Sequence, residues 1–151
     1  MIDRFEELLR DLGAEYSVSL HPDKRGICKL SINEVMNVQI EYNPDQNTLL
    51  MATFICDLPP GKFRENVLKA ALKTNHLYPE KAVLSYSEKN NQLALFHTIP
   101  ITSLTGKKLS DLLEQFIKKA DEWRVAVDTG NIASLVAPVR LEGKGMFGLM
   151  P

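Results

Sequence analysis

The run Met36-Asn37-Val38-Gln39-Ile40-Glu41-Tyr42 decides the fold class, because apolar and polar residues alternate along it without a break. A period of two is typical of a strand with one buried and one solvated face. Just upstream, Cys28, Leu30 and Ile32 share one phase of a similar run. Antiparallel sheets that are covered on one side produce this pattern. The sequence therefore predicts a sheet that packs against other elements through one face.

Further strands are predicted on the C-terminal side of this run. After the turn residues 43–47, the run from Thr48 to Cys56 is apolar in both phases, which indicates cover on both of its faces. The runs 83–87 and 92–99 flank the polar loop 88–91 and predict a hairpin. Together these runs predict a twisted antiparallel sheet of five to six strands.

Three helices are predicted around the sheet. Asp3 and Glu6 have the spacing of an N-terminal capping box, and Gly13 is the predicted stop of the first helix. Leu58-Pro59-Pro60-Gly61 introduces a second helix that ends near Asn75. The longest apolar stripe, from Leu109 to Val127, predicts a third. The order α-β-β-β-α-β-β-α indicates an α+β domain.

Composition limits the class of protein. The 151 residues are 44% hydrophobic and 25% charged with a net charge of −1, as in ordinary globular domains. No run approaches the ~20 apolar residues of a membrane span, the N-terminus lacks a secretory signal, and no basic cluster suggests nucleic acid. We expect a soluble chain with one domain over residues 1–127, followed by a Gly-rich, loosely ordered tail over residues 128–151.

Sequence motifs for chemistry are weak. Cys28 and Cys56 fall at apolar positions of strand runs, so buried free thiols are expected, and the three histidines form no zinc-ligand spacing. The GxGxxG at residues 143–148 has no room for the helix that this nucleotide motif requires. We therefore expect no enzyme, no metal and no cofactor.

Several ordered stretches resemble the type III secretion chaperones of the Tir/CesT family. The likeness extends from about Ile2 to Val127, and its specificity comes from the order and spacing of the stretches. They are Phe5 to Leu9 before Leu12-Gly13, Gly26 to Ile32, Leu49 to Ala52, Leu58-Pro59, Ala70 to Asn75, and Leu112 to Phe116 through Trp123.

The resemblance implies a function and partners. Members of the family are homodimers that hold the N-terminal chaperone-binding segment of a secreted effector in a non-globular, secretion-competent form, without nucleotide. It also implies a bacterial cytoplasmic location and suggests the secretion ATPase as a further partner. The alternative is a YbjN-like regulatory or interaction module of the same fold without a secretion client.

The resemblance also suggests site residues. Candidates for effector binding come from the first helix and the sheet: Phe5, Leu8, Leu12, Ile32, Leu49, Met51 and Ile55. Candidates for the dimer interface come from the third helix and the second hairpin: Phe116, Ala120, Trp123 and Leu95. Both sets keep an alternative as plain core, because an apolar stripe usually faces a protein interior. Replacing Phe5 and Leu8 with glutamate is expected to weaken client binding and leave a folded dimer.

Overall fold

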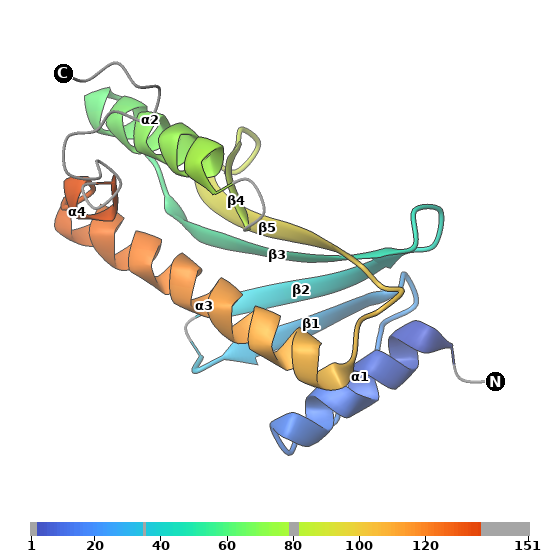
Figure 1. The fold of residues 1–151 in the computed structure, drawn as a ribbon. Helices are drawn as coiled ribbons and strands as arrows, with labels where there is room; N and C mark the ends of the chain where they lie inside the picture. Colours follow the sequence, from blue (N-terminus) through green and yellow to red (C-terminus); the bar gives the residue numbers. More distant parts are fainter. Residues whose placement is uncertain (1–2, 35, 79–81, 137–151) are drawn as a thin grey trace, which may run out of the picture.

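The computed structural model describes residues 3–34, 36–78 and 82–136 and confirms the predicted α+β order. Within these residues a short fourth helix is added at the C-terminal end (Figure 1). The elements are α1 (Arg4–Glu15), β1 (Ile27–Ile32), β2 (Met36–Asn43), β3 (Thr48–Asp57), α2 (Lys62–Leu77), β4 (Val83–Ser87), β5 (Gln92–Pro100), α3 (Gly106–Thr129) and α4 (Ala133–Val136).

The five strands form one antiparallel sheet in the order β1-β2-β3-β5-β4, so β1 and β4 are its edges. Ile40 of β2 lies opposite both Cys28 of β1 and Met51 of β3, which places the predicted apolar phases on one face. A bulge between Phe54 and Cys56 shifts the register of β3 against β5. The alternation that predicted the sheet is therefore confirmed.

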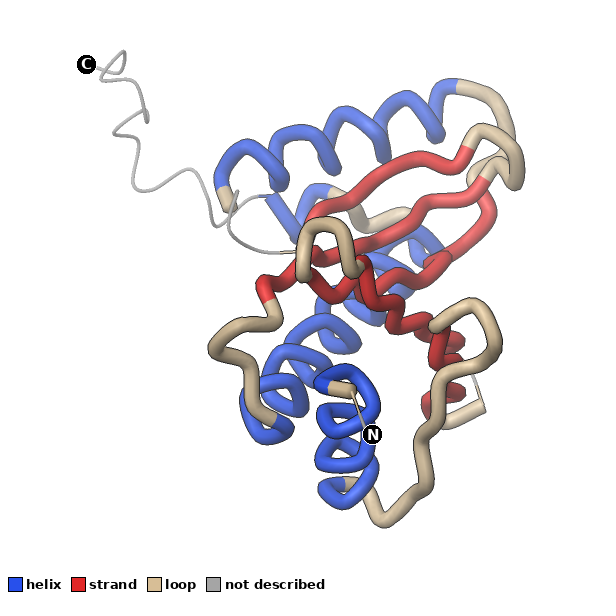
Figure 2. The backbone as a smooth tube through the Cα atoms, turned by 90° about the vertical axis from the view of Figure 1, so that its right-hand side faces the viewer, coloured by secondary structure: helices blue, strands red, loops and turns tan. Residues whose placement is uncertain are grey.

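Helices α1 and α3 cover that apolar face, while α2 lies along edge strand β4 (Figures 1 and 2). Phe5 of α1 stacks on Tyr42 of β2 with ring centroids 5.8 Å apart. The opposite face of β3 stays open within the described residues. Leu50 and Ala52 are half-buried there, and the side chain of Phe54 is 52% exposed. The cover expected on both faces of β3 is therefore not provided by the residues that the structure describes.

The N-terminal cap of α1 is confirmed, since the Asp3 carboxylate accepts a hydrogen bond of 2.8 Å from the Glu6 N–H. The predicted stop at Gly13 is wrong, because α1 continues to Glu15. Gly13 has another reason to be glycine. A Cβ at this position would lie 2.4 Å from the carbonyl oxygen of Val18, where the chain turns back over the helix.

Helix α3 is longer than its apolar stripe. The Thr105 hydroxyl caps its first turn by accepting from the Lys108 N–H at 3.1 Å, and Gly130 ends it in the left-handed conformation at φ 76°. Regular structure thus continues past residue 127 into α4. Residues 137–151, which hold most of the predicted loose tail and the GxGxxG, lie outside the described residues.

Candidate functional site

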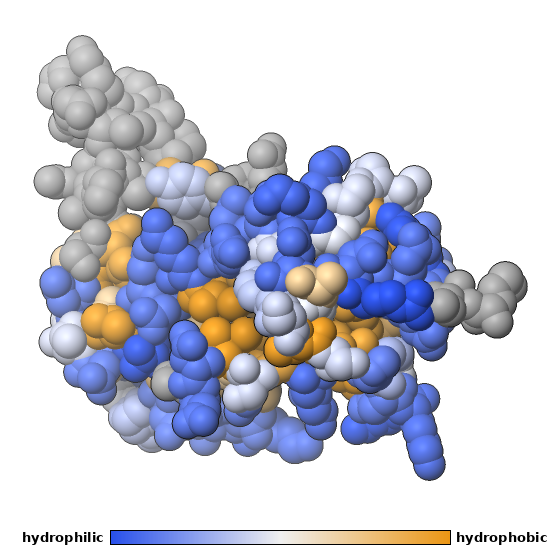
Figure 3. All heavy atoms as spheres, turned by 90° about the horizontal axis from the view of Figure 1, so that it is seen from below, coloured by the Kyte–Doolittle hydropathy of each residue, from blue (hydrophilic) through white to orange (hydrophobic). Residues whose placement is uncertain are grey.

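A groove of about 740 Å³ lies between the C-terminal end of α1, strand β1 and helix α3. In Figure 3, apolar side chains gather in a hollow on this side of the molecule, with hydrophilic residues around it. The lining residues are Leu12, Tyr16, Val18, Leu20, Leu30, Ser31, Ile32, Asn33, Met36, Leu113, Glu114, Ile117, Lys118, Asp121 and Arg124. The groove is therefore mostly apolar and open to solvent.

Two elements supply the accessible apolar wall. Leu30 and Ile32 occupy the same phase of β1 and are half-buried, as is Ile117 of α3. β1 is an edge strand, and no strand within the described residues pairs with its outer side. Alternate residues of β1 therefore direct their N–H and C=O groups away from β2. The groove combines exposed apolar surface with a free strand edge.

The rim on α3 carries balanced charge. Glu114 and Asp121 are acidic, and Lys118 and Arg124 are basic. Asp121 and Arg124 form an ion pair at 2.7 Å, so these two charges partly neutralise each other within the helix. These four charges sum to zero, so the rim favours neither a basic nor an acidic segment by net charge.

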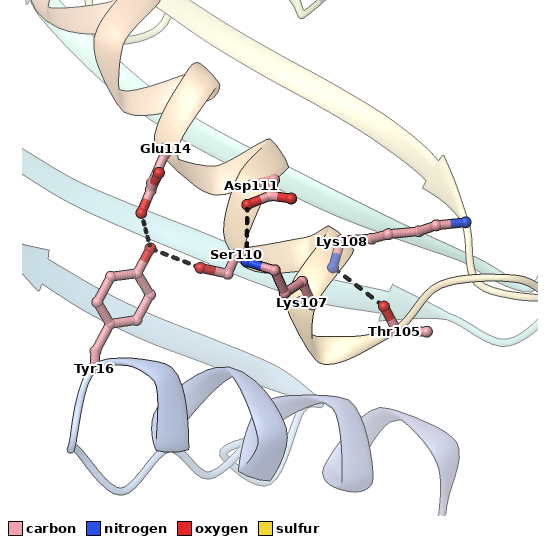
Figure 4. Close-up of polar contacts among 7 residues, drawn as sticks. All are labelled: Tyr16, Thr105, Lys107, Lys108, Ser110, Asp111 and Glu114. Carbon is pink, nitrogen blue, oxygen red and sulfur yellow. Dashed lines mark hydrogen bonds and ion pairs between the residues drawn. The ribbon is translucent and has the colours of Figure 1, made fainter.

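Polar contacts fix the end of α1 against α3 (Figure 4). The Ser110 hydroxyl donates to the Tyr16 phenol oxygen at 3.1 Å, and the Tyr16 hydroxyl donates to the Glu114 carboxylate at 3.4 Å. At Gly106 the two helices approach so closely that a Cβ would lie 2.4 Å from the Cβ of Asp11. These contacts set the spacing of α1 and α3, and hence the width of the groove.

The segment that leads from α1 into β1 is held by a turn at Asp23. Its carboxylate accepts hydrogen bonds from the backbone N–H groups of Arg25 at 2.8 Å and Ile27 at 3.1 Å. The same two bonds, that from Ile27 first, lower the pKa of Asp23 below its usual value. The turn fixes the register in which β1 begins, beside the groove.

The two thiols are unsuited to nucleophilic chemistry. Burial raises the pKa of both Cys28 and Cys56, to about 11 at Cys56, so each is protonated near neutral pH. Neither forms a disulfide. Among the residues that the structure describes, no group of three or more His, Cys, Asp or Glu could hold a metal ion. In the same residues, none of the helices has the length and apolar character needed to cross a bilayer.

The sequence-predicted effector-binding residues divide into two groups. Leu12 and Ile32 line the groove, Leu12 as its fully buried floor. The others have exposed fractions of 8% or less and lie in the core away from the groove: Phe5, Leu8, Leu49, Met51 and Ile55. Sequence reasoning missed Tyr16, Val18 and Ile117. Val18 and Leu20 alternate with serines just after α1, which was the available signal.

The four predicted dimer residues, Phe116, Ala120, Trp123 and Leu95, are each 2% exposed or less within one protomer. Their assignment to an interface stays a prediction. Besides the groove, accessible apolar surface on the sheet lies on its open face. There Phe54, Ala94 and Phe96 come from the adjacent strands β3 and β5, with Val83 of β4 opposite Phe96.

Comparison with known proteins identifies the family of this chain. The family model of the Tir chaperone protein (CesT) family matches residues 7–124, which is most of the chain. The chain belongs to this family. A sequence search of curated proteins finds no match. The family match includes most of α1, the whole sheet and most of α3, and therefore all of the residues that line the groove.

Solved structures share the fold at low identity. A chain of the HopA1–SchA chaperone–effector complex superimposes with a TM-score of 0.71 at 19% identity, covering 83% of this chain and 100% of that one. A chain of the ExsC–ExsE complex gives 0.69 at 20%, with 81% and 92% covered. A chain of the Yersinia pestis type III secretion chaperone SycH bound to a YscM2 fragment gives 0.64 at 15%, with 79% and 98% covered. This family member thus has the fold found in those complexes.

Proposed function

We propose that this protein is a type III secretion chaperone that binds the N-terminal segment of a secreted effector in the groove between α1, β1 and α3. The main support for this proposal is an open apolar groove beside a free strand edge, in a chain of the Tir chaperone family. Complexes of similar fold, such as HopA1–SchA, support an effector as the partner.

The groove suggests how a client would be held. An extended segment can pair with the outer edge of β1 through main-chain hydrogen bonds, which need no particular sequence. Alternate side chains of that segment would then enter the groove beside Leu30, Ile32 and Ile117. Because both the pairing and the burial require an extended client, binding opposes its folding. The mechanism needs no nucleotide and no covalent step.

Two further parts of the proposal concern the class of protein and its location. We infer a binding protein rather than an enzyme, because the family to which the chain belongs is one of chaperones. A chaperone that meets its client before export works in the bacterial cytoplasm, which is the location that we propose.

Ile117→Glu tests the groove. We expect the variant to remain folded, because Ile117 is only half-buried, and to bind its client at least tenfold more weakly, because a carboxylate would be desolvated by the apolar segment. Val125→Glu is the matched control, since Val125 lies on the same helix, is 44% exposed and does not line the groove.

The measurement begins with co-purification from the native bacterium and identification of the bound protein by mass spectrometry. Its N-terminal segment is then synthesised, and the affinity of each variant is measured by calorimetry. Equal affinity of Ile117→Glu and the wild-type chain would exclude this groove as the binding site.

We also propose that two protomers associate through the open face of the sheet. Phe54, Phe96 and Val83 form an apolar patch there, and a solvated sheet face would normally be polar. A twofold axis would bring the patch against its own copy without opposing charges. This surface is an alternative to the one suggested by sequence, whose four side chains are buried within the chain.

Phe54→Glu should convert the dimer to a monomer at micromolar concentration, because two carboxylates would be desolvated near the twofold axis. Sedimentation equilibrium gives the mass, and Val125→Glu, which is remote from this face, should remain dimeric. A dimeric Phe54→Glu protein would place the interface elsewhere.

A further inference from the structure

The outer edge of β1 is available for pairing over a short stretch only. β1 is an outer strand of the sheet, and β2 pairs with its inner side (Figure 1). In an antiparallel ladder, the main-chain N–H and C=O groups of successive residues point alternately toward and away from the neighbouring strand. Two independent contacts determine which residues of β1 direct these groups outward.

Asp23 determines the phase at the start of the strand. The Asp23 N–H donates to the Ile27 carbonyl at 2.8 Å, and the Asp23 carboxylate accepts from the Ile27 N–H at 3.1 Å. Both main-chain groups of Ile27 therefore point away from β2. By alternation, the same groups of Lys29 and Ser31 also point outward, while those of the residues between them point to β2.

A contact near the other end of β1 gives the same phase. Ser31 lies opposite Asn37 of β2. The Asn37 carbonyl accepts a hydrogen bond of 2.7 Å from the Thr53 hydroxyl of β3, so it points away from Ser31. The two residues of an antiparallel pair either exchange both of their hydrogen bonds or exchange neither. Ser31 therefore directs its N–H and C=O groups outward, as Ile27 does.

Both ends of this edge are closed. The two outward groups of Ile27 are already bonded to Asp23. Asn33, the next residue in the same phase after Ser31, lies beyond the end of the strand in the left-handed conformation at φ 52°. Within the described residues, no strand pairs with Lys29 and Ser31 on this side, and both residues are exposed. Four main-chain groups on two residues are thus available to a client.

We propose that the client pairs with β1 at Lys29 and Ser31 alone, and that Asp23 sets this register by occupying the next position, Ile27. This inference deepens the proposed function and rests on it. Asp23 is a positioning residue in this arrangement, because it acts on the client through the main chain of β1.

The register predicts the kind of client segment that fits. Leu30 and Ile32 alternate with the pairing residues, and their side chains line the groove. In a parallel or an antiparallel client strand, the side chains that enter the groove beside them come from two residues that are two positions apart. The segment that we expect is therefore extended, with two apolar residues separated by one residue of any type.

A short edge makes such a segment selective. Main-chain pairing does not depend on the client sequence, so selection comes from the two apolar side chains. A longer edge would also admit registers shifted by two residues, since such shifts keep every side chain on the same face. Because Asp23 closes one end and the turn at Asn33 closes the other, one register alone places both apolar side chains beside Leu30 and Ile32.

Hydrogen exchange in the full chain without client tests the edge. Relative to unfolded-chain rates, the Lys29 and Ser31 amides should be at least about tenfold less protected than the Ile27 amide. Asp23→Ala should remove the protection of Ile27, and Asp23→Asn should retain it, because a side-chain amide oxygen still accepts. Asn43→Ala breaks a similar turn between β2 and β3 and should leave Ile27 unchanged. Protected Lys29 and Ser31 amides, or an Ile27 amide that is insensitive to Asp23→Ala, would overturn the proposal.

Methylation of single amide nitrogens in the client counts the main-chain bonds. The probe is the shortest synthetic fragment of the co-purified protein whose binding Ile117→Glu weakens. In either strand direction, two client N–H groups donate to the carbonyls of Lys29 and Ser31. N-methylation should therefore lower the affinity at least about fivefold at two positions, two residues apart. Other positions should tolerate it.

Variants of Asp23 test its role with the same probe. Asp23→Pro lacks both the carboxylate and the N–H that occupy Ile27, so a third sensitive position should appear two residues from the first pair. Asp23→Asn keeps both groups and should keep the wild-type pair of positions. Circular dichroism verifies that each variant is folded, and Asp23→Ala replaces Asp23→Pro if proline disturbs the fold. An unchanged pair in a folded variant that lacks the carboxylate would show that Asp23 does not set the register.

The two proposals fail separately. If Ile117→Glu weakens client binding but the wild-type chain shows no sensitive position, or more than two, the groove is the binding site and the register at Lys29 and Ser31 is wrong. If Ile117→Glu binds the client as the wild-type chain does, the proposed groove is wrong, and the register proposed for its client is wrong with it.

Discussion

Leu8→Glu is expected to unfold the protein rather than to weaken client binding. Leu8 is fully buried in the core between α1 and the sheet. Loss of its packing costs about 2–5 kcal/mol. Desolvation of an unpaired carboxylate adds several kcal/mol more. Domains of this size are stable by only about 5–15 kcal/mol, so the sum reaches or exceeds the whole free energy of unfolding.

Circular dichroism with urea titration measures this effect. The matched control is Leu72→Glu, the same substitution on a helix residue that is 69% exposed, where a change within about 0.5 kcal/mol is expected. Leu8→Met should also remain folded, because it conserves volume. If Leu8→Glu folded and unfolded cooperatively, α1 would have to be able to move away from the sheet. The hypothesis that the first helix binds the client would then be supported again.

The expected unfolding of Leu8→Glu changes how the groove must be tested. The double replacement of Phe5 and Leu8, suggested by the sequence, would lose client binding through loss of the fold, since Phe5 is also buried. The informative variants are at half-buried positions such as Ile117. An apolar stripe on a helix does not distinguish the core from a groove wall, because both require the same residue types.

The sequence was sufficient for the fold and insufficient for the site, and particular residues explain why. Alternation along β2 and the Asp3 cap predicted elements correctly, because local periodicity and hydrogen bonding determine them. The groove depends instead on a close approach at Gly106 and on Tyr16 reaching α3 across 94 positions of sequence. Neither contact has a local signal. Gly13 was mistaken for a helix stop because a glycine needed for tight packing looks the same in sequence as one needed for a turn.

Strand β3 illustrates the same limit on the other face. Its two apolar phases indicated cover on both sides, but within the described residues only one side has it. An apolar pattern indicates which faces of a strand are buried in the functional state. It does not indicate whether the same chain or a partner chain covers them. An open apolar face with Phe54 at its centre is therefore an argument for a partner.

Asn75→Ala should destabilise the fold by about 2–4 kcal/mol, because it leaves two buried backbone groups of an edge strand without hydrogen-bond partners. The Asn75 amide donates to the Leu84 carbonyl at 2.8 Å and accepts from the Leu84 N–H at 2.9 Å. The N–H and C=O groups of Leu84 therefore point away from β5. The Asn75 side chain of α2 forms with them the hydrogen bonds that a sixth strand would otherwise form. Alanine leaves two polar groups of a residue that is 3% exposed without these partners.

Asn75→Asp separates the two bonds, since a carboxylate still accepts from the Leu84 N–H but cannot donate to its carbonyl. We expect it to fall between Asn75 and Asn75→Ala in urea titration. Hydrogen exchange at the Leu84 amide should quicken in Asn75→Ala beyond the change in global stability. Unprotected strand edges also recruit other strands, so the variant should aggregate sooner on heating. If Asn75→Ala kept wild-type stability and exchange, α2 would not be the element that closes this edge, and β4 would be a second free edge beside β1.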